Sequence, residues 1–229
     1  MDATIDTSGK QNSAGGTARW AFIFVFALYF AWTGAWLLER YLETKAGFPV
    51  TSGGRFLYWL VMKVFLWILP SIMLLRASGF SVRGVMGCDR VRSILVWGGG
   101  TGLLLGTITL TVKWAGGHPL FASPLGWPLF SAVAVAPLLE EFTFRGAILH
   151  ALTRRFRFWA ANTITALLFL GIHMPGWHFQ GRLLENLFDP VSGALSIFLL
   201  GLVFGWVAHR SKSVAAGVLA HGLNNLFNA

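Results

Sequence analysis

Residues 128–152 read PLFSAVAVAPLLEEFTFRGAILHAL, an apolar run with two carboxylates and a guanidinium near its middle. A helix of this length crosses the roughly 30 Å hydrocarbon core of a bilayer, at about 1.5 Å per residue. Each charge at the bilayer centre costs about 2.5–3.5 kcal/mol, so three unpaired charges would cost about 7–10 kcal/mol. We therefore expect Glu140, Glu141 and Arg145 to face the interior of a helical bundle. The alternative is that the span ends near Leu139 and exposes them, and the apolar residues that follow argue against it.

The composition of the whole chain also indicates a membrane protein. Of its 229 residues, 55% are hydrophobic and only 12% are charged, whereas a soluble domain carries about a quarter charged residues. The net charge of +9 suits nucleic acid, but the basic residues lie in short clusters between apolar runs, as in the loops of membrane proteins. We therefore expect a lipid bilayer as the partner and no nucleic acid.

Six further apolar runs have the length of membrane spans. They lie at about 20–38, 56–75, 93–112, 158–174, 192–208 and 213–229. The sequence thus predicts an all-α fold, a polytopic transmembrane helical bundle of about seven spans, with eight as the alternative count. Residues 1–19 are polar and are expected to form a disordered tail before a single transmembrane domain over residues 20–229.

Two other segments have recognisable patterns. Gly98, Gly102 and Gly106 are spaced four residues apart, a pattern that lets two membrane helices approach closely. Residues 175–191 are amphipathic and are expected to form an interfacial helix or a re-entrant piece.

The distribution of basic residues predicts an orientation in the cell membrane. With seven spans, the N-terminal tail and the loops on its side contain 11 Lys and Arg residues, and the loops on the other side contain 5. Because positive loops stay in the cytoplasm, the N-terminus is predicted to be cytoplasmic and the C-terminus to lie outside.

Helical geometry divides the roles of the two adjacent glutamates. Glu141 and Arg145 are four residues apart and share a helix face, so they can pair. Glu140 lies about 100° around the helix and is not neutralised by that arginine as easily. One carboxylate is thus expected to be structural, which leaves the other free for proton transfer.

Two later spans contain further polar residues. His173 ends one span, and Phe169 lies four residues earlier on the same face. His221 and Asn225 are likewise four residues apart within an apolar helix, where polar pairs either take part in chemistry or hold helices together. Hydrolysis of a peptide bond needs a base for water and donors for the developing oxyanion, and these residue types supply both. The chain has no His-Glu-x-x-His, Gly-x-Ser-Gly or Gly-x-Gly-Asp motif, which excludes three other protease chemistries.

In these motifs the chain resembles the CAAX-protease and bacteriocin-processing family of intramembrane proteases. The resemblance rests on EEFTFR at 140–145, FLGIH at 169–173 and HGLNN at 221–225, which place a protease-like core at about 128–229. It implies that Glu140 activates water together with His173, and that His221 and Asn225 polarise the carbonyl and stabilise the oxyanion. Glu141 and Arg145, with Phe169, would support the site.

The resemblance also implies the reaction and its partners. The expected activity is endoproteolysis in or near the membrane, processing the C-terminus or leader of a membrane-associated protein or peptide with water activated by glutamate. No metal is favoured. Zinc held by Glu140, His173 and His221 stays the alternative, because His and Glu are zinc ligands. The rival functions are a non-catalytic immunity or scaffold member of the same family and a proton-coupled membrane transporter.

Overall fold

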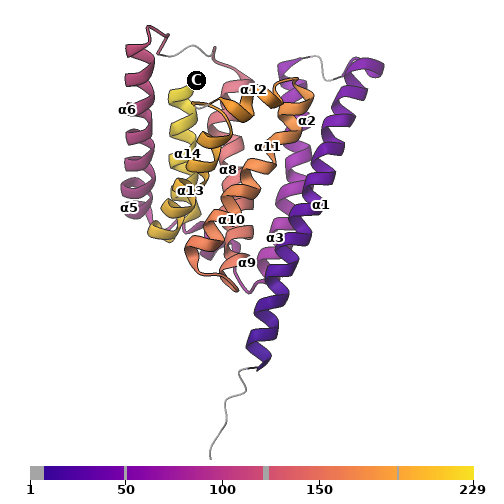
Figure 1. Ribbon diagram of the computed structural model, residues 1–229, viewed down its shortest axis with the longest axis vertical. Helices are drawn as coiled ribbons and strands as arrows, with labels where there is room; N and C mark the ends of the chain where they lie inside the picture. The colour runs from indigo at the N-terminus through magenta and orange to yellow at the C-terminus, as the bar shows by residue number, and fades with distance from the viewer. Residues whose placement is uncertain (1–7, 49–50, 121–123, 190) are drawn as a thin grey trace, which may run out of the picture.

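The computed structural model describes residues 8–48, 51–120, 124–189 and 191–229, and within them every regular element is a helix (Figure 1). The α-helical segments are α1 (Ser8–Ala46), α2 (Ser52–Lys63), α3 (Leu69–Ala77), α4 (Val82–Met86), α5 (Val91–Ser93), α6 (Gly100–Ala115), α7 (Trp127–Phe130), α8 (Ala136–Glu141), α9 (His150–Thr153), α10 (Phe158–Gly171), α11 (His173–Phe179), α12 (Leu183–Phe188), α13 (Ala194–Ser211) and α14 (Val214–Asn228). Four π-helical segments join some of them end to end: η1 (Val64–Ile68), η2 (Ile94–Gly99), η3 (Ser131–Val135) and η4 (Phe142–Leu149). The prediction of an all-α helical bundle is confirmed.

The chain runs along the bundle seven times, and a helix covers each predicted span (Figure 1). Five stretches are long and apolar enough to cross a membrane: 16–46, 52–77, 91–115, 158–179 and 194–211. The remaining two predicted spans do not meet these criteria of length and apolar character. The helix over 127–153 carries three charged residues near its middle, and α14 has only 15 residues.

One detail differs from the sequence-based expectation. Helix α1 begins at Ser8, so the second part of the predicted disordered tail is helical, while residues 1–7 lie outside the described residues. Residues 8–19 contain no proline, and a helix already formed by the apolar span extends into them at the low cost of propagation. The amphipathic stretch 175–191 forms the end of α11 and the short helix α12, with Leu184 and Phe188 exposed.

Prolines set the local geometry of two of the crossing helices. Pro70 and Pro137 each follow a π-helical segment, in which a backbone N–H donates to the carbonyl five residues earlier. A proline has no N–H to donate, and a π-bulge is one way a helix accommodates this loss. Pro175 stands just after the break between α10 and α11, so the helix restarts at His173.

The three glycines at 98, 102 and 106 line the face that η2 and α6 present to α14. A Cβ at Gly98 would lie 2.5 Å from the Ala216 carbonyl oxygen, and a Cβ at Gly102 would lie 2.7 Å from Leu223 Cβ. Only glycine allows this approach, so the predicted packing role of the three glycines is confirmed. The contact places α14, the helix of His221 and Asn225, in the middle of the bundle.

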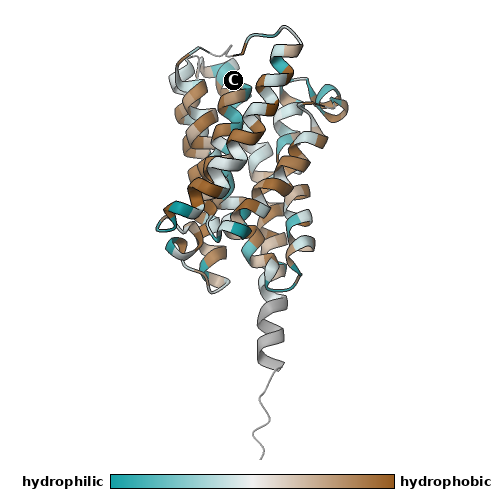
Figure 2. Ribbon diagram, turned by 90° about the vertical axis from the view of Figure 1, so that its left-hand side faces the viewer, coloured by the Kyte–Doolittle hydropathy of each residue, from teal (hydrophilic) through white to brown (hydrophobic). Residues whose placement is uncertain are grey.

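Polar residues gather at the two ends of the bundle, and apolar residues run along the helices between them (Figure 2). The connections after α3, α9 and α13 lie at the end where α1 begins, and the C-terminus lies at the opposite end (Figure 1). The end that holds these three connections is called the basic end below, because it contains the larger group of Lys and Arg residues counted from the sequence.

Candidate active site

Glu141 and Arg145 form the buried centre of the site. Arg145 Nη1 donates to Glu141 Oε1 at 3.0 Å, and neither side chain has any exposed area. Arg145 Nη2 donates to the Gly201 carbonyl at 2.9 Å and so ties this helix to α13. The contact expected from the four-residue spacing is therefore present, and it removes one of the two carboxylates from solvent entirely.

His221 is joined to the same carboxylate. Its Nδ1 lies 2.9 Å from Glu141 Oε1, and its ring stacks on Phe204 with the ring centres 4.7 Å apart. Because the carboxylate accepts, Nδ1 carries the hydrogen and Nε2 is the nitrogen left for other contacts. Glu141 thus orients the imidazole through this bond.

Glu140 has a different partner, Lys63 at the end of α2. Lys63 Nζ lies 2.7 Å from Glu140 Oε1, and the side chains of the two residues are 14% and 12% exposed, respectively. An ammonium so close favours the ionised carboxylate. The sequence-based reasoning gave Lys63 no role, although a lone cation in an otherwise apolar span was the signal that could have identified it.

His173 is held at the break between α10 and α11. Its Nδ1 lies 2.8 Å from the carbonyl oxygen of Phe169, which can only accept, so Nδ1 donates the hydrogen bond. In the neutral ring, Nε2 therefore carries the lone pair. The bond to the Phe169 carbonyl thus fixes the tautomer that leaves Nε2 free to act as a base.

Phe169 connects these groups. Its ring centre lies 4.9 Å from that of His173 and 6.3 Å from that of His221, with the rings nearly perpendicular in both pairs. The Arg145 guanidinium carbon lies 4.5 Å from the same ring centre. The predicted contact of Phe169 with His173 is present, in edge geometry, and the ring fills the apolar space between the two histidines.

Glu140 and His173 line one cavity of about 180 Å³, together with Lys63 and Gln180. A second cavity of about 270 Å³ lies beside it and shares Lys63, Trp32 and Trp36 with the first. His221 does not line either cavity. It reaches the site through its bond to Glu141, the residue next to Glu140.

Asn225 lies further along α14, and its side chain hydrogen-bonds to a backbone carbonyl of another helix. Its Nδ2 donates to the Ala132 carbonyl at 2.8 Å, and its Oδ1 lies 3.3 Å from Asn224 Nδ2. In the π-helical turn of η3, the Ala132 carbonyl would point to the nitrogen of Pro137, which has no hydrogen to donate. Asn225 supplies the missing donor, which fits the helix-joining alternative left open by the sequence, and one N–H of the amide stays available.

The residues named for a metal site do not form a compact ligand cluster. Among the described residues, no three His, Cys, Asp or Glu side chains come together in a way that could hold a metal ion. Glu140 and Glu141 are instead occupied by Lys63 and Arg145, which balance the two carboxylates with two cations.

Comparison with known proteins gives one family. Residues 122–227 match the family model described as type II CAAX prenyl endopeptidase Rce1-like. All three motifs quoted from the sequence lie within this stretch. No curated protein and no solved structure matches the chain.

Proposed function

Because residues 122–227 belong to the Rce1-like family, part of the CAAX-protease and bacteriocin-processing family, we propose that the protein is an intramembrane endopeptidase that uses Glu140 to activate water. The observation that carries the proposal is the shared cavity of Glu140 and His173, since it brings two candidate bases from separate helices to one place. The family supports the reaction class, and the assignment of roles rests on the contacts described above.

In the proposed reaction, a water molecule in the cavity hydrogen-bonds to Glu140 and to Nε2 of His173. Glu140 takes a proton from this water while the oxygen attacks the carbonyl carbon of the scissile peptide bond. The protonated Glu140 then gives its proton to the leaving nitrogen as the C–N bond breaks. Lys63 is proposed to hold the Glu140 carboxylate in place at the cavity through their ion pair.

His221 is proposed to stabilise the negative oxygen that forms during attack. Its Nδ1 is fixed on Glu141, so the charged ring presents Nε2–H to an oxyanion, and the buried carboxylate offsets the positive charge. Arg145 neutralises Glu141 when His221 is uncharged. Asn225 keeps a second amide N–H beside its bond to the Ala132 carbonyl and is proposed as a second donor.

The cavity walls indicate an apolar substrate segment. Trp32, Trp36 and Trp67 line the cavity of Glu140, and Phe56 and Trp59 line the adjoining one. An extended stretch of a transmembrane protein fits such walls better than a charged peptide does. With the N-terminus in the cytoplasm, the cavity is proposed to open toward the outer half of the membrane, because α11 leads from it to the end opposite the basic end (Figure 1).

A proteomic comparison tests this function. Cells carrying the wild-type protein and cells carrying Glu140→Gln should differ in the new termini of a small set of membrane proteins. The matched control is Glu185→Gln, which removes an exposed carboxylate paired with Arg182. If the Glu140→Gln cells yield the same termini as wild type, the protein is a non-catalytic family member; a loss of ion flux without a change in termini would indicate the transporter.

A further inference from the structure

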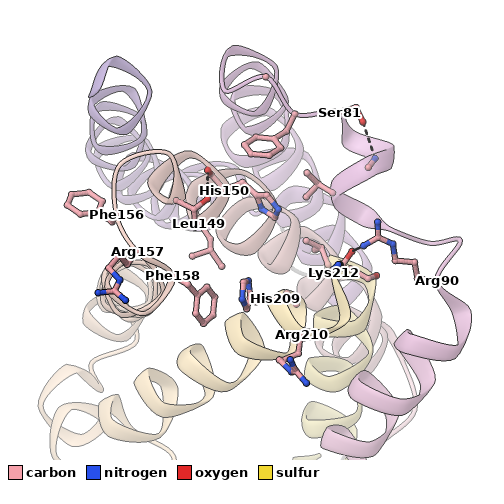
Figure 3. Close-up of a pocket in the computed structure, with 18 residues that line it drawn as sticks. Ser81, Arg90, Leu149, His150, Phe156, Arg157, Phe158, His209, Arg210 and Lys212 are labelled. Atoms are coloured by element: carbon pink, nitrogen blue, oxygen red, sulfur yellow. Dashed lines mark hydrogen bonds between the residues drawn. The ribbon is translucent and has the colours of Figure 1, made fainter. Parts of the chain in front are cut away.

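A large cavity lies at the basic end of the protein, away from Glu140. It measures about 910 Å³ and is lined by the connection after α3, the end of α9, the start of α10 and the connection between α13 and α14 (Figure 3). None of its lining residues belongs to the three sequence motifs, so the proposed peptidase reaction leaves it without a role.

Cations from separate connections lie around this cavity. Arg90, Arg157, Arg210 and Lys212 line it, and none of them has a carboxylate partner among the described residues. No Asp or Glu is among the lining residues. Arg90 donates to the Lys212 carbonyl, so its guanidinium fixes two connections relative to each other and keeps further N–H groups for a ligand.

Two histidines in the cavity are held by contacts with neighbouring residues. His150 Nδ1 donates to the Arg145 carbonyl at 2.8 Å, and the His209 ring stacks on Phe158 with centres 3.9 Å apart. Figure 3 shows both imidazoles in the middle of the cavity, with Arg157 and Arg90 on opposite sides. The histidines are thus held in place between cations that surround them.

Lys212 provides an independent observation. It is the one non-glycine residue in the described chain with positive φ, at 53°, where it ends α13. Glycine is the residue that this position favours, because a Cβ is strained in the left-handed conformation. The chain instead has a lysine at this position, and it lines the cavity. Backbone strain of this kind clusters at functional sites.

We propose that this cavity binds the phosphate headgroup of an anionic phospholipid. Guanidinium groups bind phosphate in a bidentate manner, and basic pockets between helices on the cytoplasmic side of membrane proteins take such headgroups. The walls are also apolar, with Phe80, Phe156 and Phe158, which suits the glycerol and first acyl carbons of a lipid. A free phosphate ion would use the cations alone and leave most of the volume unfilled.

Thermal unfolding of the full-length protein in detergent tests the proposal. Short-chain phosphatidylglycerol should raise Tm, and short-chain phosphatidylcholine should not. Arg157→Gln should weaken the apparent affinity for phosphatidylglycerol about fivefold, the effect of removing one cation near a lipid phosphate. Arg83→Gln is the matched control, because it removes a cation from the same end but outside the cavity.

Lys212→Gly separates ligand binding from folding. Without lipid it should raise Tm, because glycine relieves the left-handed strain, yet it should lose affinity for phosphatidylglycerol about fivefold. Equal losses in Arg157→Gln and Arg83→Gln would overturn the proposal, since the response would then report overall charge. Inorganic phosphate that stabilises the protein as much as the lipid at equal concentration would overturn the assignment to a lipid.

Discussion

Substitution of the two adjacent glutamates by glutamine should lower the stability of the protein by different amounts. Glu141→Gln leaves Arg145 without its carboxylate partner, at a position where both side chains have no exposed area. Removing one partner of such a buried pair costs about 3–5 kcal/mol. For a chain of this size each kcal/mol lowers Tm by roughly 2–4 °C, so we expect a decrease on the order of 10 °C. Glu140→Gln should cost less, about 1–2 kcal/mol, because its pair with Lys63 keeps a small exposed fraction and borders a cavity in which the remaining ammonium can be hydrated.

Thermal unfolding of the purified variants in detergent, followed by tryptophan fluorescence, measures both effects. Glu185→Gln serves as the control, and its Tm should equal that of the wild type because the carboxylate is exposed. The double variant Glu141→Gln/Arg145→Met should recover a large part of the lost stability, since it removes the orphaned charge. If Glu140→Gln lowers Tm as much as Glu141→Gln does, the division into a structural and a chemical carboxylate is refuted.

Three further predictions concern packing, orientation and metal dependence. Gly98→Ala should lower the free energy of unfolding by about 1–3 kcal/mol, because the new Cβ meets the backbone of α14. Gly100→Ala is the control in the same unfolding assay. It should be neutral or slightly stabilising, because a Cβ at Gly100 has open space around it. Cys88 is exposed at the basic end and should react with a membrane-impermeant maleimide only after cells are permeabilised. A cysteine introduced by His118→Cys, in a protein that also carries Cys88→Ser, should react in intact cells. The reverse pattern of labelling would show that the predicted orientation is inverted. Dialysis of the purified enzyme against a chelator should leave cleavage unchanged, and a loss of activity that Zn²⁺ restores would show that the metal-free assignment is wrong.

The sequence predicted the parts of the fold that depend on local patterns. Long apolar runs give the helices, and four-residue spacing gives the contact of Glu141 with Arg145. The glycine spacing in residues 98–106 gives the close approach of another helix, although the pattern does not say that the partner is α14. These features follow from helix geometry and from the cost of unpaired charge in lipid.

The features that were missed depend on contacts between distant segments. Lys63 is 77 residues from Glu140 in sequence, and no local pattern links the two. The bond from Asn225 to the Ala132 carbonyl depends on a π-helical turn next to Pro137, whose register is set only by the packed structure. The cavity at the basic end was likewise visible in the sequence only as scattered cations, which were used to predict orientation.

Oxygen transfer from water to product tests the catalytic proposal most directly. The purified wild-type protein, placed in lipid nanodiscs with membrane proteins extracted from cells that lack it, should generate peptides in H₂¹⁸O whose new carboxyl termini carry ¹⁸O. Glu140→Gln should reduce this labelling at least about 100-fold, the usual contribution of a general base, while its Tm falls by only a few degrees. Labelling by Glu140→Gln at the wild-type rate would contradict the claim that Glu140 activates the attacking water.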